Sequence, residues 1–185
     1  MPTCGAGRRM VSLVSELVII AHNIRSTHNI GAILRTADGF GVSRVYCTGY
    51  TPYPELPGDT RLAHLRQKIT KQIHKTALGA EVTIPVEHAE EVLPAISSLL
   101  QQGFQIVALE QHKRAVLLPN FTPPQKTALL LGEEVHGTPQ DLLAQCNAVI
   151  EIPMRGKKES YNVSVAAGIA MYALTVSQAP SPNYG

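Results

Sequence analysis

Four polar side chains stand at the ends of predicted helices and strands, where a ligand can reach them: Arg35, Glu134, Ser160 and Asn162. A guanidinium group recognises phosphate or ribose oxygens. A carboxylate that follows a parallel strand accepts hydrogen bonds from a cofactor or a ribose. Free amides at a helix start favour negative charge. Together these residue types predict a site for a ligand that carries phosphate or ribose.

Arg35 belongs to a predicted helix over Asn29–Gly41, in which Asn29 is expected to accept the free amides of the first turn. The apolar residues of this helix recur with the spacing of a core face: Ile30, Ile33, Leu34 and Ala37. Arg35 lies off that face, and Gly31 is predicted to leave open space beside its guanidinium. The alternative is a simple surface pair of Arg35 with Asp38, worth roughly 0.2–0.5 kcal/mol.

Glu134 follows a buried strand within the segment TALLLGEEVHG, residues 127–137. Its flanking glycines allow a ligand to approach the backbone closely. The alternative is an ordinary strand-to-helix turn with a solvated acidic pair. Ser160 and Asn162 lie at the start of a helix predicted over Tyr161–Ser177, which is apolar on nearly every side and therefore expected to be buried. Helix capping is the simpler alternative role for both residues.

Apolar segments alternate along the chain in the manner of an α/β domain with a parallel sheet flanked by helices. The predicted strands are Leu17–Ile24, Ser43–Thr48, Glu81–Pro85, Phe104–Leu109, Thr127–Leu131 and Ala148–Pro153. The other predicted helices are Arg61–Leu78, His88–Gln102 and Pro139–Cys146. We expect a short N-terminal arm (1–16), one domain (17–178) and a flexible tail (179–185).

The 185 residues are 44% hydrophobic and 16% charged, which suffices for one core without disulfides or metals. Cys4, Cys47 and Cys146 form no CxxC pair, so we expect no zinc site, no disulfide framework and a reducing cytoplasm. No HExxH or HxH cluster is present, and no stretch reaches the ~20 apolar residues that span a bilayer. The net charge of +2 is a weak hint of nucleic acid.

Three segments resemble, in order and spacing, the motifs of the SpoU/TrmH branch of the SPOUT superfamily. The first is NIRSTHNIGAILRTADGFGV, which carries Asn29, Gly31 and Arg35. The second contains Gly132, Glu134 and Gly137 in the pattern G-x-E-x-x-G. The third, IEIPMRGKKESYNVSVAAGIAMYAL, covers I-P-M and then S-x-N-V-S-x-A. This resemblance implies an S-adenosylmethionine-dependent RNA ribose 2′-O-methyltransferase that releases S-adenosylhomocysteine.

The resemblance also implies a single SPOUT domain with a C-terminal deep trefoil knot, which general topology rules could not have predicted. The family works as a homodimer, with the last helix and the first motif meeting the partner. Its methyl donor lies in the knotted loops. The corresponding residues here are Leu109, Glu110, Leu131, Gly132, Glu134, Ile152, Met154, Ser160, Tyr161 and Asn162.

Family proposals give activation of the ribose 2′-hydroxyl to the arginine that corresponds to Arg35. An arginine is a reluctant base, so we expect it to act with a nearby phosphate or partner group. Asn29, Ser160 and Asn162 are expected to order the catalytic site. Two basic clusters predict contacts to RNA phosphates. They comprise Arg61, Arg66, Lys68, Lys71 and Lys75 in one, and Arg155, Lys157 and Lys158 in the other. A solvated helix is the alternative for the first cluster.

Alternatives remain for the function. The chain could be a catalytically silent RNA-binding dimer of the same fold, or a SPOUT enzyme that methylates a base. A doubly wound oxidoreductase would need GxGxxG after the first strand, where the sequence has Asn29-Ile30-Gly31. The short arm favours tRNA over rRNA as the substrate. The modified nucleotide cannot be identified from the sequence.

Overall fold

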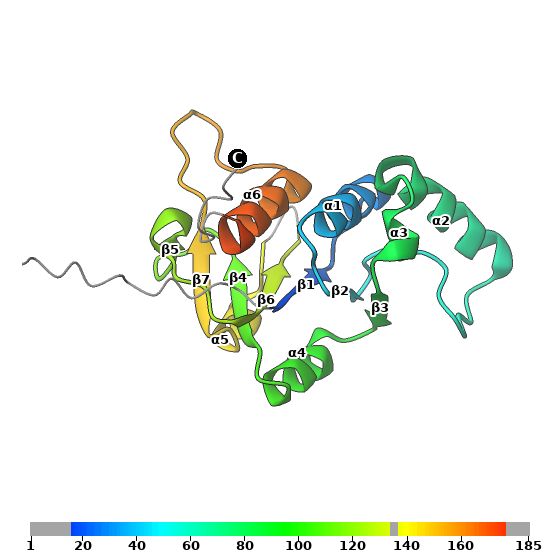
Figure 1. The fold of residues 1–185 in the computed structure, drawn as a ribbon, viewed down its shortest axis with the longest axis horizontal. Helices are drawn as coiled ribbons and strands as arrows, with labels where there is room; N and C mark the ends of the chain where they lie inside the picture. The colour runs from blue at the N-terminus through cyan, green and yellow to red at the C-terminus, as the bar shows by residue number, and fades with distance from the viewer. Residues whose placement is uncertain (1–15, 134–136, 177–185) are drawn as a thin grey trace, which may run out of the picture.

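The computed structural model describes residues 16–133 and 137–176. Within these ranges, seven parallel strands form one sheet in the order β3-β2-β1-β6-β4-β7-β5 (Figure 1). The strands are β1 (Glu16–His22), β2 (Arg44–Thr48), β3 (Val86–Ala89), β4 (Gln105–Leu109), β5 (Val116–Leu117), β6 (Lys126–Leu131) and β7 (Ala148–Glu151). The α-helices are α1 (Thr27–Gly39), α2 (Ala63–Ala77), α3 (Ala80–Thr83), α4 (Val92–Gln101), α5 (Gln140–Ala144) and α6 (Val163–Thr175). The predicted α/β fold is confirmed.

Helices cover both faces of the sheet, and the alternation of side chains along each strand produces two cores. On β1, Ile19 and Ala21 belong to the core that packs under α1 and α6. Val18 and Ile20 belong to the core with residues of α4 and α5. Because both faces are buried, the central strands are apolar throughout, as is typical of parallel sheets.

The region between α2 and α4 differs from the sequence prediction. The predicted strand Glu81–Pro85 is mostly the short helix α3, and the strand of this region is β3, which was assigned to the next helix from His88 onward. Val82, Thr83 and Ile84 of this segment are β-branched residues, which are typical of strands. The chain instead turns at Gly79 (φ 104°). Pairing with β2 begins only at Val86, which lies opposite Val45. β5 was also missed, because two exposed residues carry no periodicity.

The last helix is also different from the prediction of complete burial. One face of α6 packs into the core through Ala167, Ala170, Met171 and Leu174. The opposite face exposes Val165, Ile169 and Tyr172 in this single chain, and Val176, which directly follows the helix, is exposed as well. The sequence could not distinguish a helix buried within one chain from a helix with a second apolar face. Residues 1–15 and 177–185 lie outside the described ranges, so the arm and the tail stay predictions.

Candidate active site

A cavity of about 590 Å³ lies where β4, β6 and β7 end and α6 begins. Leu109 and Leu131 are the last residues of β4 and β6, and Ile152 directly follows β7. The carboxyl ends of parallel strands meet at one edge of a sheet, which is where open α/β sheets bind ligands. The cavity is lined by Leu109, Glu110, Gln111, Leu131, Gly132, Glu133, Gly137, Glu151, Ile152, Met154, Glu159, Ser160, Tyr161, Asn162, Val163 and Ala166.

Nine of the ten residues predicted to hold a methyl donor line this cavity. The tenth, Glu134, lies outside the described residues. The residues come from three segments far apart in the sequence, so the structure brings the predicted set together around one space. That this space holds a methyl donor stays a prediction. Among the described residues, no cluster of His, Cys, Asp or Glu is arranged to bind a metal ion.

The lining combines apolar side chains with carboxylates. Leu131, Ile152 and Val163 offer a surface for a flat apolar ring, and Glu110 and Glu133 add negative charge. Such a cavity suits a ligand that has both an apolar ring and a positive charge.

Glu110 shapes the cavity as well as lining it. Its Oε2 accepts a hydrogen bond from the Thr138 backbone N–H at 2.7 Å, and its Oε1 accepts one from the Gln111 N–H at 3.0 Å. Gly137 has a φ of 68°, and a Cβ there would lie 2.5 Å from Glu110 Oε2. The Glu110 carboxylate therefore fastens the chain after β6 to the end of β4.

Asn29 and Asn162 join the first predicted motif to the third. Asn162 Nδ2 donates to Asn29 Oδ1 at 3.2 Å, and Asn162 Oδ1 accepts from the Ser164 N–H at 2.9 Å, which caps α6. The prediction that Asn29 caps its own helix was wrong. α1 begins two residues earlier, and Ser26 Oγ accepts the Asn29 N–H at 3.2 Å. Asn29 is thereby left inside the first turn, with its side chain directed at Asn162.

Arg35 does not line this cavity. It is exposed on α1 and lines a separate shallow hollow with Ala32, Thr36, Lys75 and Thr76. Among the described residues Arg35 makes no ion pair, so the alternative pairing with Asp38 is not observed. Asp38 instead accepts a hydrogen bond from Thr83 Oγ1.

The predicted role of Gly31 was wrong. A Cβ at Gly31 would lie 2.1 Å from Thr76 Oγ1 and 2.3 Å from the Ile73 carbonyl oxygen. Gly31 therefore permits close packing of α1 against α2 and does not clear space for Arg35. The sequence spacing predicted on which side of α1 Gly31 lies, but not that α2 covers this side.

Sequence reasoning missed a polar cluster at the ends of β1 and β2. His22 Nδ1 lies 3.0 Å from Thr48 Oγ1, and Asn23 Nδ2 lies 3.2 Å from His22 Nε2. Arg25 Nη2 pairs with Glu133 Oε1 at 2.9 Å and so connects this cluster to the cavity wall. Burial lowers the pKa of His22, and the nearby Glu133 opposes this shift. The position of His22 at the carboxyl end of a central strand was the signal that could have identified it.

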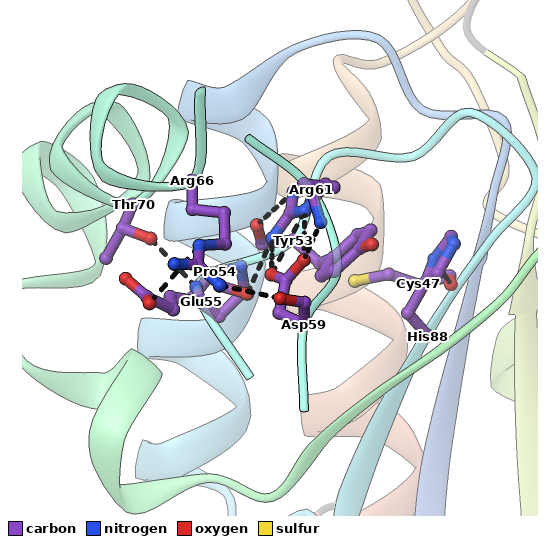
Figure 2. A network of polar contacts seen from close by, with 9 residues as sticks. All are labelled: Cys47, Tyr53, Pro54, Glu55, Asp59, Arg61, Arg66, Thr70 and His88. Atoms are coloured by element: carbon purple, nitrogen blue, oxygen red, sulfur yellow. Dashed lines mark hydrogen bonds and ion pairs between the residues drawn. The ribbon is translucent and has the colours of Figure 1, made fainter. Parts of the chain in front are cut away.

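Two of the predicted RNA contacts, Arg61 and Arg66, make contacts within the protein, and RNA binding by them stays a prediction. Arg61 pairs with Asp59, and its Cζ lies 3.5 Å from the centroid of the Tyr53 ring (Figure 2). Tyr53 stacks in turn on His88, with ring centroids 3.9 Å apart. Arg66 Nη1 donates to the Asp59 carbonyl oxygen at 2.6 Å. These contacts fix the proline-rich loop before α2. The acidic partners precede the basic stretch in sequence, so a count of charges within that stretch could not reveal them.

The other predicted RNA contacts are exposed. Lys68, Lys71 and Lys75 project from α2, and Arg155, Lys157 and Lys158 lie on the loop between β7 and the cavity residues that precede α6. Their exposure leaves them accessible to a polyanion, and RNA binding by them stays a prediction. None of the helices within residues 16–133 and 137–176 could span a membrane.

Comparison with known proteins gives one consistent group of relatives. A family model described as the SpoU rRNA Methylase family matches residues 16–172. A tRNA (guanosine(18)-2′-O)-methyltransferase of Aquifex aeolicus is 32% identical over 157 residues, which are 85% of this chain and 67% of that protein. A 23S rRNA (guanosine-2′-O-)-methyltransferase of Coxiella burnetii is 30% identical over 168 residues, 90% of this chain and 61% of the relative. The chain thus spans only part of the length of these relatives.

Solved structures agree with the fold. The crystal structure of the Aquifex aeolicus TrmH/SpoU tRNA modifying enzyme has a TM-score of 0.70 and 26% identity, covering 88% of this chain and 75% of that one. The AdoMet-bound rRNA methyltransferase of Sinorhizobium meliloti has a TM-score of 0.73 and 24% identity, covering 88% and 57%. The second likeness shows the fold alone.

Proposed function

The chain belongs to the SpoU rRNA Methylase family, and from this premise we propose that it transfers a methyl group from S-adenosylmethionine to a ribose 2′-hydroxyl of RNA. The observation that carries the proposal is the cavity at the ends of β4, β6 and β7. It gathers nine predicted donor-binding residues, and one of them, Asn162, contacts Asn29 of the first motif.

The residues of the cavity fit the methyl donor. Its volume of about 590 Å³ falls within the roughly 300–1,000 Å³ of small-molecule sites. Leu131, Ile152 and Val163 would pack against the adenine ring, and Glu110 and Glu133 would offset the positive charges of the donor. When bound, the sulfonium supplies an electrophilic methyl group.

The chain's own residues would prepare the acceptor. A ribose 2′-hydroxyl is a poor nucleophile until its proton is removed or its charge is stabilised. Arg35 would bind the adjacent phosphate and hold it where one of its oxygens can accept that proton. Asn29, Ser160 and Asn162 would hold the ribose in place, and this positioning would supply most of the acceleration.

The position of Arg35 favours a homodimer as the active form. Arg35 follows Asn29 by six residues on α1, roughly 9 Å along a helix axis at about 1.5 Å per residue. α6, which packs beside α1, exposes Val165, Ile169 and Tyr172, and the residue after it, Val176, is exposed as well. A second copy packed on this apolar face would bury it and would lie next to α1, the helix that carries Arg35. The deep trefoil knot and a cytoplasmic location belong to the same proposal.

Structured RNA is the proposed substrate, with tRNA placed before rRNA. The Aquifex relative acts on tRNA and the Coxiella relative on 23S rRNA. We favour tRNA because the identity to the Aquifex protein is the higher of the two. The exposed cations of α2 and of the loop after β7 would neutralise phosphates of either RNA.

The test is methyl transfer from labelled S-adenosylmethionine into total tRNA and total rRNA from cells that lack the gene. We expect label in tRNA, recovered after nuclease digestion as a 2′-O-methyl nucleoside. Arg35→Ala should abolish transfer while thermal unfolding stays unchanged, since Arg35 is exposed. Arg35→Lys keeps the charge but not the bidentate geometry, so it should recover only part of the rate.

Other results would redirect the assignment. Label on a base would indicate a base-methylating enzyme. RNA binding without transfer, and without binding of S-adenosylhomocysteine by calorimetry, would indicate the silent RNA-binding dimer.

A further inference from the structure

The loops after β1 (residues 23–26) and after β2 (residues 49–51) are hydrogen-bonded to each other beside the cavity, and together we call them the shelf. The Asn23 N–H donates to the Thr48 carbonyl oxygen at 3.2 Å, and Asn23 Oδ1 accepts the Tyr50 N–H at 3.3 Å. The buried Thr51 Oγ1 accepts the Ile24 N–H at 3.0 Å and donates to the Ala21 carbonyl oxygen at 3.0 Å. Each loop therefore holds the other in place.

The shelf contains backbone strain. Asn23 has a φ of 56°, a left-handed conformation that non-glycine residues rarely adopt. A Cβ at Gly49 (φ 66°) would lie 2.0 Å from Asn23 Oδ1, so a side chain there would displace Asn23. Such strain persists only where the surroundings enforce it, and it concentrates at functional sites.

Tyr50 projects from this shelf as an exposed aromatic ring. Its exposed fraction is 52%. The Arg25 Cζ lies 5.8 Å from the ring centroid, within the range of a cation–π contact. Arg25 also pairs with Glu133, which lines the cavity, and yet its side chain remains 65% exposed. An aromatic ring and a planar cation are thus held at the rim of the proposed donor site.

We propose that Tyr50 and Arg25 form a stacking platform for an unpaired RNA base next to the methylated ribose. This inference rests on the proposed function. Unpaired bases stack on aromatic rings and on guanidinium planes, and such stacking tolerates different bases. Sequence-specific RNA recognition targets unpaired segments, whose bases can be splayed away from one another, so a 2′-hydroxyl presented to the cavity from such a segment brings neighbouring unpaired bases with it. A platform at the rim would receive one of them.

The absence of tryptophan from the chain permits a direct test. Tyr50→Trp places the only tryptophan of the chain on the platform, where it can be excited selectively, and Val82→Trp places one at the 83% exposed position 82 of α3 as a matched control. The probes are an RNA hairpin with an unpaired loop and a blunt duplex of the same stem. We expect the hairpin, but not the duplex, to quench Tyr50→Trp, and neither RNA to quench Val82→Trp. An unquenched Tyr50→Trp protein that binds the hairpin would overturn the platform.

Kinetics give the second readout. Tyr50→Leu should raise the KM for RNA on the order of tenfold, since removing an aromatic stack costs about that much affinity per base. The KM for S-adenosylmethionine should not change. Tyr50→Phe, which keeps the ring, should recover most of the affinity that Tyr50→Leu loses. A Tyr50→Leu protein that dissociates into monomers in sedimentation would assign Tyr50 to a protein interface and overturn the proposal.

Failure of the platform differs from failure of the proposed function. If the wild-type protein methylates RNA and Tyr50→Leu does so with an unchanged KM for RNA, only the platform is wrong. If the wild-type protein transfers no methyl group to RNA, the proposed function fails, and the platform, which depends on it, fails with it.

Discussion

The side chain of Asn162 donates from Nδ2 to Asn29 Oδ1 at 3.2 Å, although 133 positions separate the two residues. The other end of the same amide accepts from the Ser164 N–H at 2.9 Å and from Ser164 Oγ at 2.7 Å. One side chain therefore caps α6 and ties it to the first turn of α1. Position 162 serves stability and site geometry at once, and substitutions can separate the two roles.

Asn162→Ser should separate capping from the link to α1. Serine caps a helix about as well as asparagine but is too short to reach Asn29, whereas Asn162→Ala removes both contacts. We expect Asn162→Ser to unfold at nearly the wild-type temperature. For Asn162→Ala, we expect the free energy of unfolding to be lower by about 1 kcal/mol. Both should lose methyl transfer to RNA. Thermal unfolding and the labelled-donor assay measure the two effects, and full activity of Asn162→Ser would show that the Asn29 contact is dispensable.

Much of the fold follows from the sequence because buried parallel strands are continuous apolar runs. The segments around Ile19, Val107 and Leu129 were placed within one or two residues. Helix α3 and strand β3 were not, because their type depends on the turn at Gly79 and on pairing with β2. Local propensity does not contain that pairing.

The candidate site was predictable to a different degree. The predicted donor-binding residues Leu109, Leu131 and Asn162 do line one cavity, but their convergence depends on strand order, which periodicity does not give. The role of Gly31 was misjudged and the internal contacts of Arg61 were missed for one reason. Both depend on neighbours from other segments, namely Thr76 packed on Gly31 and Tyr53 stacked under Arg61.

Gly31→Ala and Gly39→Ala should change stability in opposite directions. A methyl group at Gly31 meets Thr76 Oγ1 at 2.1 Å and the backbone of α2, whereas nothing lies within 4 Å of a Cβ at Gly39. We expect Gly31→Ala to lower the free energy of unfolding by about 1–3 kcal/mol through overpacking. Gly39→Ala should raise it by about 0.4–1 kcal/mol through reduced entropy of the unfolded chain. Urea denaturation compares them, and equal effects would contradict tight packing of α1 on α2.

Removal of the Arg61 side chain should lower stability, whereas removal of the Lys71 side chain should not. Arg61→Ala leaves the Asp59 carboxylate, whose pKa the Arg61 hydrogen bond lowers, without its main partner. We expect a loss of about 1–3 kcal/mol in the free energy of unfolding. The exposed Lys71→Ala should stay within about 0.5 kcal/mol.

The two variants should differ in RNA binding as well. If Lys71 contacts a phosphate, Lys71→Ala should reduce the slope of log affinity against log salt by about 0.7–0.9. Arg61→Ala should leave that slope unchanged at temperatures where it is folded. Filter binding to tRNA over a range of salt concentrations measures this, and an unchanged slope for Lys71→Ala would remove Lys71 from the RNA surface.

His22 should make the stability of the domain depend on pH. The Asn23 amide donates to His22 Nε2, so Nδ1 carries the proton and donates to Thr48 Oγ1. Protonation of Nε2 would displace Asn23, which also holds Tyr50. Burial lowers the pKa of His22 in the folded protein below its ordinary value of 6.5.

The sign of the effect follows from proton linkage. As the pH falls through 6.5, the unfolded chain takes up a proton at His22 before the folded protein does. The free energy of unfolding therefore decreases as the pH decreases through this window. The stabilising contribution of neutral His22 is fully present only above pH 6.5. His22→Gln cannot titrate, so its loss of stability between about pH 7.5 and pH 5.5 should be smaller than that of the wild type. Urea denaturation across this range measures the difference, and parallel pH profiles of the two proteins would show that His22 is not held in its neutral form.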